Sequence, residues 1–437
     1  MNTIKNIITQ IKSGVYDRAF MRMYGFNAIE VHRERYKKAV NKFGEIFGTE
    51  KEVMLFSAPG RTEIGGNHTD HNHGRVLAAS VNLDVIGVAS LSSENCIKIK
   101  SEGFDMDTVY LDDLAVQNDQ KGCSASLIRG MAESFVKNGF NIGGFDAYTT
   151  SDVLKGSGLS SSAAFEVLIG TILNSLYNSR KADGVKIAQM AQYAENVHFG
   201  KPCGLMDQMA SSIGGVITID FNDPTNPITE KVNFDFDKSG YNLCIVDTGG
   251  NHADLTPEYA SITIEMKAVS KSLGVSYLRE TSMEKLMNKL PELRKLHGDR
   301  AVLRAIHFLR ENQRVTKQVE ALELGDFDEF CRLIIESGHS SFEYLQNSYS
   351  SCNVTEQGLP LALCLAQGVL NDNGAWRVHG GGFAGTTQNF VPGELLDSFC
   401  SVMEGVFGKN SCHVLKIRPV GGVELDYLST QNSTTLG

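Results

Sequence analysis

The sequence lacks the long apolar segments that membrane spans require, because no stretch approaches about 18 consecutive apolar residues. Its first twenty residues, MNTIKNIITQIKSGVYDRAF, contain no apolar region followed by a small-residue cleavage site, as a secretory signal would. It also lacks an excess of basic residues: 41 Lys and Arg stand against 51 Asp and Glu, which gives a net charge of −10. We therefore expect a cytoplasmic protein with neither a membrane nor a nucleic acid as its partner.

Cysteine is present, but not in the close-spaced pairs that structural zinc sites need. The nine cysteines include no CxxC, and their odd number is atypical of a disulfide framework. We predict reduced, partly buried thiols, and single out Cys203 only for its neighbours. The nine are Cys96, Cys123, Cys203, Cys244, Cys331, Cys352, Cys364, Cys400 and Cys412.

Two common catalytic signatures are absent from the whole chain. Without GxxxxGK[ST] there is no P-loop of the Walker type. The segment HGGG at 379–382 matches the oxyanion loop of lipase-type hydrolases, but such enzymes also need a GxSxG nucleophile elbow, and the chain has none. Glycines this dense instead indicate a main chain that closely approaches another element or a ligand.

A chain of 437 residues is too long for one ordinary core, so we expect two or three domains. Apolar residues at helical spacing predict one or two amphipathic helices over 16–48. Strands are predicted over 51–59, ending at Pro59-Gly60, and over 75–91, 97–111, 214–221, 242–249 and 412–419, with a glycine loop between two strands around 376–392. Polar residues 221–240 mark a lobe boundary, and 250–371 are mostly helical. No regular βαβ period occurs, which favours a mixed α+β architecture.

The segment LKGSGLSSSAA (154–164) has the composition of a phosphate-binding turn. Gly156, Ser157 and Gly158 let backbone N–H groups converge, and a helix begins shortly afterwards, whose N-terminus attracts an anion. The serines at 160–162 could cap that helix or offer oxygens to a phosphate-bound Mg²⁺. The loop does not match the dinucleotide fingerprint GxGxxG. The same sequence is also compatible with an alternative in which a serine caps a helix after an ordinary glycine turn.

Two further segments concentrate polar groups. In GGNHTDHNHG (65–74), three histidines and Asp70 could ligate zinc or bind a polar substrate by hydrogen bonds. In HFGKPCGLMDQMASS (198–212), Asp207 stands among apolar residues, where a carboxylate is costly unless a cation pairs with it or it accepts a proton. A surface Asp that caps a helix is the simpler alternative.

These segments, in this order, resemble the galactokinase branch of the GHMP small-molecule kinases. The family opens with GR-x-N-x-I-G-E-H-T-D-Y-N-x-G, which corresponds to residues 60–74 here. Its G-x-G-L-S-S-S-A loop matches 156–163, its C-G-x-M-D-Q matches 203–208, and its GGGFGG matches 380–385. The resemblance extends over residues 20–425. It implies a two-lobed GHMP kinase fold with a mixed-sheet N-terminal lobe and a helix-rich, ferredoxin-like C-terminal lobe.

The resemblance also implies a domain plan and an activity. We expect an N-terminal helical extension that packs on the sugar site (1–48), an N-terminal lobe with both loops (49–230) and a C-terminal lobe (231–437). The implied activity is an ATP-dependent sugar 1-kinase that phosphorylates the C1 hydroxyl of galactose or a close analogue, using ATP and Mg²⁺. We expect a monomer whose partners are the sugar and the nucleotide.

Roles follow from the matched positions. Asp207 takes the place of the catalytic aspartate, and Arg61 that of the arginine that stabilises this aspartate and the transferring phosphoryl group. The implied sugar contacts are Asn67, His68, Asp70, His71 and Tyr259. The implied ATP contacts are Lys155, Gly156, Ser157, Gly158, Leu159, Ser160, Ser161 and Ser162, with Ser162 and Glu195 as Mg²⁺ ligands. The late glycine loop comprises Gly380, Gly381, Gly382 and Gly385.

The chain departs from the family pattern in both loops. Glu63 replaces an Asn, Asn67 a Glu and His71 a Tyr, while His379 replaces a Thr and Ala384 a Gly. A neutral amide at position 67 would tolerate an anionic C6 group, so a galacturonokinase is an alternative. A sugar sensor without turnover is another, although the SSSA segment that such sensors lose is intact here.

Overall fold

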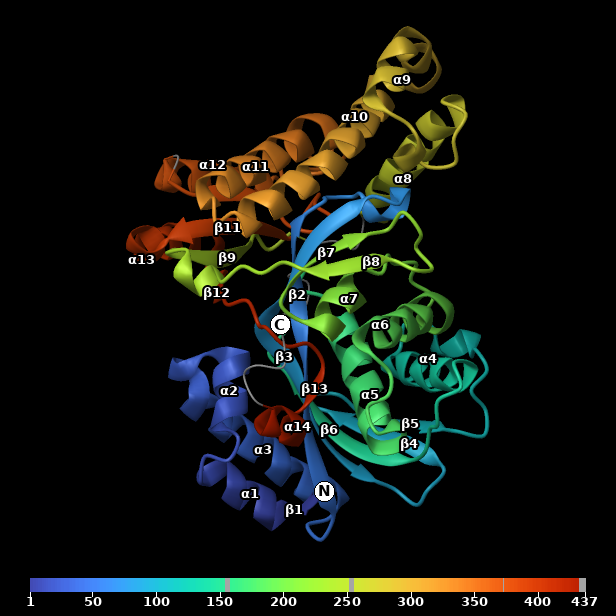
Figure 1. The fold of residues 1–437 in the computed structure, drawn as a ribbon, viewed down its shortest axis with the longest axis vertical. Helices are drawn as coiled ribbons and strands as arrows, with labels where there is room; N and C mark the ends of the chain where they lie inside the picture. Colours follow the sequence, from blue (N-terminus) through green and yellow to red (C-terminus); the bar gives the residue numbers. More distant parts are fainter. Residues whose placement is uncertain (154–157, 251–254, 372, 432–437) are drawn as a thin grey trace.

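The computed structural model describes residues 1–153, 158–250, 255–371 and 373–431, and builds them around two β-sheets (Figure 1). The larger sheet follows the path β1-β2-β3-β6-β4-β5, with β13 on β2, β7 on β3 and β8 on β7. Neighbours run antiparallel except β4 and β6. The strands are β1 (Asn2–Thr3), β2 (Glu52–Gly65), β3 (Arg75–Leu91), β4 (Cys96–Ser101), β5 (Met106–Tyr110), β6 (Phe145–Ser151), β7 (Val216–Asp220), β8 (Ile228–Lys231) and β13 (Val423–Glu424).

The smaller sheet is antiparallel throughout, in the order β10-β11-β9-β12. Its strands are β9 (Tyr241–Asp247), β10 (Ala375–Val378), β11 (Thr386–Pro392) and β12 (Cys412–Leu415). Helices separate β9 from β10 and β11 from β12, so the chain order is βαββαβ, the ferredoxin-like arrangement. The predicted α+β class with a helix-rich second lobe is confirmed.

Helices cover both faces of the larger sheet, and further helices pack against the smaller sheet (Figure 1). The first lobe contains α4 (Ser124–Lys137), α5 (Ser161–Asn178), α6 (Gly184–Tyr193) and α7 (Met206–Ile213). The second contains α8 (Thr256–Ser272), α9 (Met283–Asn288), α10 (Leu290–Glu323), α11 (Phe327–Ser340), α12 (Gly358–Leu370) and α13 (Leu396–Phe407). Residues of α5 are buried on most sides, as its nearly uniform apolar sequence predicts.

Strand β2 does not end at Pro59-Gly60, contrary to the sequence prediction. It continues to Gly65, and its pairing with β3 shifts register between Pro59 and Arg61. Proline has no N–H group to donate to a neighbouring strand, so Pro59 is tolerated here because the register shift interrupts the hydrogen bonds between the strands. A Cβ on Gly60 would lie 2.9 Å from the Leu159 carbonyl oxygen, which shows how closely the phosphate loop approaches this strand.

The domain plan predicts that the N-terminal helices pack on the sugar site, whose expected loop is residues 65–74 (the sugar loop), whereas the structure packs them elsewhere on the larger sheet. They are α1 (Ile4–Lys12), α2 (Asp17–Tyr24) and α3 (Ile29–Phe47), so the helical prediction for 16–48 is confirmed. Their apolar faces cover the first half of β2 and the far half of β3, where Leu55, Ile86 and Val88 are buried with Phe20 and Tyr36. The sheet face opposite α5 is apolar at this end, and it determines where the helices pack.

The end of the chain returns to the first lobe. Strand β13 pairs with β2, and α14 (Leu425–Thr430) packs against β2 and α2. The segment predicted as a lobe boundary, 221–240, also contributes β8 to the larger sheet. The lobe boundaries at 48 and 230 stay predictions. Among the described residues, no helix combines the length and apolar character needed to cross a bilayer.

Candidate active site

An ion pair joins Arg61 on β2 to Asp207 in the first turn of α7. Arg61 Nε donates to Asp207 Oδ1 at 2.7 Å, and its Nη1 donates to the carbonyl of Gly158. Burial disfavours the charge on Arg61, but the nearby Asp207 carboxylate more than offsets this, so the pKa of Arg61 is raised. The Asp207 side chain is 30% exposed, so a ligand can reach it. The two residues expected to cooperate are therefore in contact.

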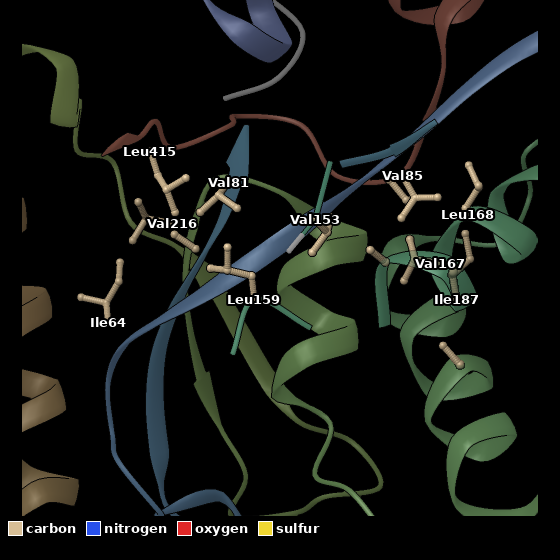
Figure 2. Close-up of a cluster of buried hydrophobic side chains, with 14 of the residues drawn as sticks. Ile64, Val81, Val85, Val153, Leu159, Val167, Leu168, Ile187, Val216 and Leu415 are labelled. Carbon is tan, nitrogen blue, oxygen red and sulfur yellow. The ribbon is translucent and has the colours of Figure 1, made fainter. Parts of the chain in front are cut away.

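The phosphate loop is anchored in the core next to this pair. Leu159 is fully buried in the hydrophobic cluster of Figure 2, which also contains Val81 and Val153. Its carbonyl oxygen accepts a hydrogen bond from Arg61 N at 3.1 Å. Backbone and side chain of Arg61 thus both hold the described part of the loop, which begins at Gly158. Lys155, Gly156 and Ser157 lie outside the described residues.

Ser160 does not cap the helix that follows it. Its backbone is left-handed, with φ 56°, and its hydroxyl donates to Asp207 Oδ2 instead. The serine-capped alternative is therefore not what the structure shows. Helix α5 begins at Ser161 with no side-chain cap, so its N-terminus stays open toward an anion. Asp207 likewise pairs with Arg61 rather than capping α7.

Ser162 and Glu195 provide two oxygen atoms that could hold one cation. Ser162 Oγ lies 3.2 Å from Glu195 Oε1, and Gln208 Nε2 fixes the other carboxylate oxygen at 2.8 Å. Glu195 lies in a π-helical turn, Ala194–Phe199, a distortion common at functional sites. Mg²⁺ takes few protein oxygens and completes its shell with phosphate and water, so this pair fits it. Lys201 Nζ forms an ion pair with the same Glu195 oxygen, Oε1, at 3.2 Å.

Two acidic groups beside this pair, the buried Glu166 and the partly buried Cys203, have raised pKa values. Burial raises the pKa of Glu166 well above its ordinary value, and the carboxylate of Glu195 raises it further. Burial likewise raises the pKa of the Cys203 thiol. A protonated thiol is a poor nucleophile, so Cys203, which the sequence singled out for its neighbours, has no sign of nucleophilic activation here.

The sugar loop places Asp70, His71 and His68 around one point. His71 N donates to Asp70 Oδ1 at 2.8 Å, and His71 Nδ1 lies 3.5 Å from the same oxygen. Burial, with a smaller effect from His71, lowers the pKa of His68 to about 4, so this ring is neutral near pH 7. A Cβ on Gly204 would lie 2.0 Å from Asp70 Oδ2, so only glycine lets the carboxylate approach the segment before Asp207 this closely.

The histidines of this loop do not converge on a metal. His68 Nε2 lies 2.9 Å from the Gly381 oxygen, whereas His73 stacks on Tyr277 with ring centroids 3.6 Å apart. Within 1–153, 158–250, 255–371 and 373–431, no three His, Cys, Asp or Glu side chains are grouped to hold an ion. Hydrogen bonding to a polar ligand is the interpretation of the loop that these contacts favour.

Asn67 differs from the other expected sugar contacts, because its side chain is fully buried and already saturated. Its Nδ2 donates to Glu63 Oε1 at 3.0 Å and to the Gly380 oxygen at 2.6 Å. Its Oδ1 accepts from Asn347 Nδ2 at 2.8 Å and from Ser341 Oγ at 3.2 Å. In this structure Asn67 therefore supports the loop from behind and offers no group to a sugar.

The late glycine loop packs on the sugar loop. The oxygens of Gly380 and Gly381 bond to Asn67 and His68, and the Gly382 oxygen accepts from Tyr259 OH at 2.8 Å. Gly382 has φ 81°, and a Cβ there would lie 2.1 Å from the Asn347 oxygen. The alanine that replaces a family glycine at position 384 does not strain this turn, because Ala384 is not among the residues with positive φ. Its neighbours Phe383 and Gly385 adopt positive φ instead, and the φ of 94° falls on the glycine.

His379 connects the two glycine loops. Its Nε2 accepts from Glu63 N at 3.3 Å and contacts Thr62 Oγ1 at 3.1 Å, while Nδ1 lies 3.0 Å from Thr386 Oγ1. A Cβ on Gly158 would lie 3.2 Å from the same ring. Burial, and then the charge of Arg61, lowers the pKa of His379 well below its ordinary value. A neutral ring thus joins the phosphate loop to the second lobe.

Several residues of this site escaped sequence reasoning. Lys201 and Gln208 contact Glu195, and Arg377 pairs with Glu63. Glu311 accepts a hydrogen bond from Gly66 N in the sugar loop. Gln208 stood next to Asp207 in the matched CGLMDQ segment, and that adjacency was the available signal. Lys201 lies in the 198–212 segment and Arg377 lies two residues before His379, but no local pattern indicates that either contacts a carboxylate, and Glu311 is far from the loops in sequence.

Two family signatures match this chain. The galactokinase galactose-binding signature matches residues 41–91, and the GHMP kinase N-terminal domain matches residues 126–215. Galactokinase from Streptomyces coelicolor is 32% identical over 374 residues, which cover 84% of this chain and 91% of that protein. Galactokinase from Clostridium acetobutylicum is also 32% identical, over 372 residues that cover 82% and 90%.

Solved structures agree with these relatives. Lactococcus lactis galactokinase complexed with galactose superimposes with a TM-score of 0.75 at 26% identity, covering 88% of this chain and 98% of that one. Methanococcus jannaschii mevalonate kinase, at 13% identity and a TM-score of 0.60 over 84% and 98%, shares the fold alone. Because both signatures match, and because a relative is 32% identical over 374 residues that cover 91% of its length, the chain belongs to the galactokinase family of GHMP kinases.

Proposed function

We propose that this chain transfers the γ-phosphoryl group of ATP to the C1 hydroxyl of galactose. The observation that carries the proposal is the Arg61–Asp207 pair, which leaves a fixed carboxylate accessible beside the phosphate loop. Relatives named galactokinase, and the Lactococcus lactis structure complexed with galactose, support this choice of sugar.

Asp207 acts as the proton acceptor in this proposal. Arg61 Nε and Ser160 Oγ each hold one carboxylate oxygen, which fixes the orientation of the group. As the C1 oxygen attacks the γ-phosphorus, its proton passes to Asp207, the new O–P bond forms and the bond to ADP breaks. Arg61 keeps its positive charge throughout, since its pKa is raised, and stabilises the negative charge of the phosphoryl group.

Nucleotide phosphates would bind at the N-terminus of α5 and the loop before it, through Lys155 to Ser162. Ser162 and Glu195 would hold Mg²⁺, which when bound neutralises phosphate charge. The Lys201 ammonium shares the Glu195 oxygen, so it would have to move aside or contact a phosphate itself. The late glycine loop would act indirectly, by supporting the sugar loop.

Asp70, His68, His71 and Tyr259 are the proposed sugar contacts. The side chains of Asp70 and His71 are 25% and 21% exposed, so both retain surface for a ligand. Vicinal hydroxyl groups suit a carboxylate acceptor beside imidazole rings. Asn67 is not included because its polar atoms are occupied within the protein. A neutral amide that faces C6 would favour a sugar acid, but the Asn67 side chain is buried within the protein, which favours galactose.

The deciding experiment measures ADP release with ATP, Mg²⁺ and a panel of galactose, galacturonate and glucose. We expect turnover with galactose in preference to galacturonate. Asp207→Asn should lower kcat by about 10²–10⁴-fold, the usual contribution of a general base. Asp299→Asn is the matched control, because Asp299 is a 65% exposed partner in a surface ion pair.

Two results would contradict the proposal. Preference for galacturonate would show that C6 specificity does not depend on the residue at position 67. Binding of sugar and ATP without turnover would instead favour the sensor. In Asp207→Asn, unchanged thermal unfolding would confirm that a loss of rate reflects chemistry rather than misfolding.

A further inference from the structure

Three cysteines from separate elements meet on the helix-covered face of the smaller sheet. Cys400 lies on α13, Cys412 begins β12, and Cys244 lies on the neighbouring strand β9. The Cys412 and Cys400 sulfur atoms are 3.5 Å apart. Because Cys412 pairs with Val246, it shares a face with Cys244 two residues earlier. The kinase function proposed above uses none of these thiols.

The three thiols differ in access to solvent. Cys244 is fully buried, while Cys400 and Cys412 are partly exposed. Hydrogen bonding from the Cys244 thiol, with help from Cys412, lowers the pKa of Cys400 to about 6 against the opposing effect of burial. The pKa of Cys244 is raised by the same contacts and by burial. The thiolate, which is the reactive form, therefore resides on a sulfur atom that solvent can reach.

We propose that Cys400 and Cys412 form an oxidisable dithiol that closes to a disulfide on exposure to hydroperoxides. The Cys400 thiolate attacks the peroxide O–O bond, an S–O bond forms, and the released oxygen leaves as water after taking a proton. The Cys412 sulfur then attacks the sulfenic sulfur atom, an S–S bond forms, the S–O bond breaks and a second water leaves. Two thiols and one hydrogen peroxide thus give one disulfide and two waters.

The backbone around the pair allows this closure. The two residues are twelve positions apart, and the turn between α13 and β12 contains Gly408, which has φ 100° and, apart from its chain neighbours, no heavy atom within 4 Å of where a Cβ would lie. A sulfur–sulfur distance of 3.5 Å exceeds a disulfide bond by an amount that side-chain rotation of two partly exposed cysteines can supply. The product would tie α13 to the edge strand of the sheet that carries the late glycine loop.

The test treats the full chain with hydrogen peroxide, blocks the remaining thiols and maps the peptides. We expect two of the nine thiols to be lost first, with a peptide that links Cys400 to Cys412 and that dithiothreitol separates. Cys412→Ser should accumulate a sulfenic acid on Cys400 that a dimedone probe labels, and Cys400→Ser should lose both products. Cys364→Ser is the control, because that exposed cysteine on α12 should leave the product unchanged.

The proposal is overturned if Cys400 oxidises no faster than Cys364, or if the first disulfide uses another cysteine or another molecule. Circular dichroism of Cys400→Ser separates loss of the site from loss of the fold, and Cys400→Ala is a second variant for the same purpose. The readout is a covalent product, so it stands or fails independently of kinase turnover.

Discussion

Position 67 has an amide where the family pattern has a carboxylate, and position 63 has a carboxylate where the family has an amide. The structure shows these two departures to be one exchange, since Asn67 Nδ2 donates to Glu63 Oε1 at 3.0 Å. Arg377 Nη2 pairs with the same Glu63 oxygen at 2.5 Å. Burial raises the pKa of Glu63, although Arg377 and Asn67 oppose this effect. The exchange keeps one carboxylate and one amide in contact, one at the end of β2 and one in the sugar loop.

Asn67→Glu should therefore destabilise the protein strongly. It would place a second carboxylate against Glu63 in a fully buried position, which costs about 2–4 kcal/mol of unfolding free energy. The double variant Glu63→Asn with Asn67→Glu restores one carboxylate and one amide, so it should recover at least half of that loss. Urea unfolding of both single variants and the double variant measures the coupling.

Additive effects in this cycle would show that the two positions are independent. Asn67→Gln serves as the size control, because it lengthens the side chain without adding charge.

At the scale of elements, helix α10 holds the sugar loop in place through hydrogen bonds to its backbone. Glu311 Oε1 accepts from Gly66 N at 3.2 Å and from Ser337 Oγ at 2.6 Å, and the carboxylate pairs with Arg314. One turn earlier on the same helix, His307 Nε2 lies 2.9 Å from the backbone carbonyl oxygen of Asn67. The loop geometry thus depends on a helix that begins more than 200 positions later in the sequence.

The Glu311 carboxylate predicts a specific acid sensitivity. Burial would raise its pKa, but Arg314 and other partners more than offset this and lower it from 4.5 to about 2. A depressed folded-state pKa stabilises the protein above about pH 4.5, and this contribution is lost as the pH falls from there toward 2. The resulting loss of unfolding free energy should approach about 3 kcal/mol.

Urea unfolding at a series of pH values checks this prediction. Glu311→Gln should be less stable at pH 7 and should lose stability less steeply between pH 5 and 2. Glu320→Gln on the same helix is the control, because that side chain is exposed. Equal slopes for Glu311→Gln and the unmodified chain would show that Glu311 does not dominate acid unfolding.

At the scale of the whole molecule, Asp84 on β3 joins three distant segments. Its buried carboxylate accepts from Arg418 Nη1 at 3.0 Å, from Arg35 Nη1 at 2.5 Å and from Tyr24 OH at 2.5 Å. These partners come from the C-terminal segment and the N-terminal helices. The network therefore ties the N-terminal helices and the C-terminal segment to the larger sheet near the middle of β3, where Asp84 pairs with Pro59 of β2.

Arg418→Met should lower the unfolding free energy by about 3–5 kcal/mol, because it leaves Asp84 buried with one cation fewer. The loss should appear as a lower denaturation midpoint of the full chain. Arg294→Met is the matched control: its ion pair with Asp299 is exposed, so its effect should stay within about 0.5 kcal/mol. Similar effects for the two variants would contradict the role given to this network.

Local patterns anticipated much of this fold. The helices of 16–48, the strand at 75–91, the buried helix after the phosphate loop and the late strand at 412 are where their periodicity predicts. Periodicity reports which face of a segment is apolar, so it identifies elements well. It does not report which other segment covers that face, so it could not correct the expectation that the N-terminal helices pack on the sugar site, whereas the structure packs them on the first half of β2.

The sequence by itself determined the family, the α+β class and the identities of Arg61, Asp207 and the glycine loops, because short motifs with fixed spacing depend only on neighbours along the chain. Only the tertiary structure decided that Asn67 is buried, that Glu63 is its partner and that Glu311 and His379 hold the loops. Those contacts join positions far apart in the chain, and they form only when the two lobes and their helices bury surfaces against one another.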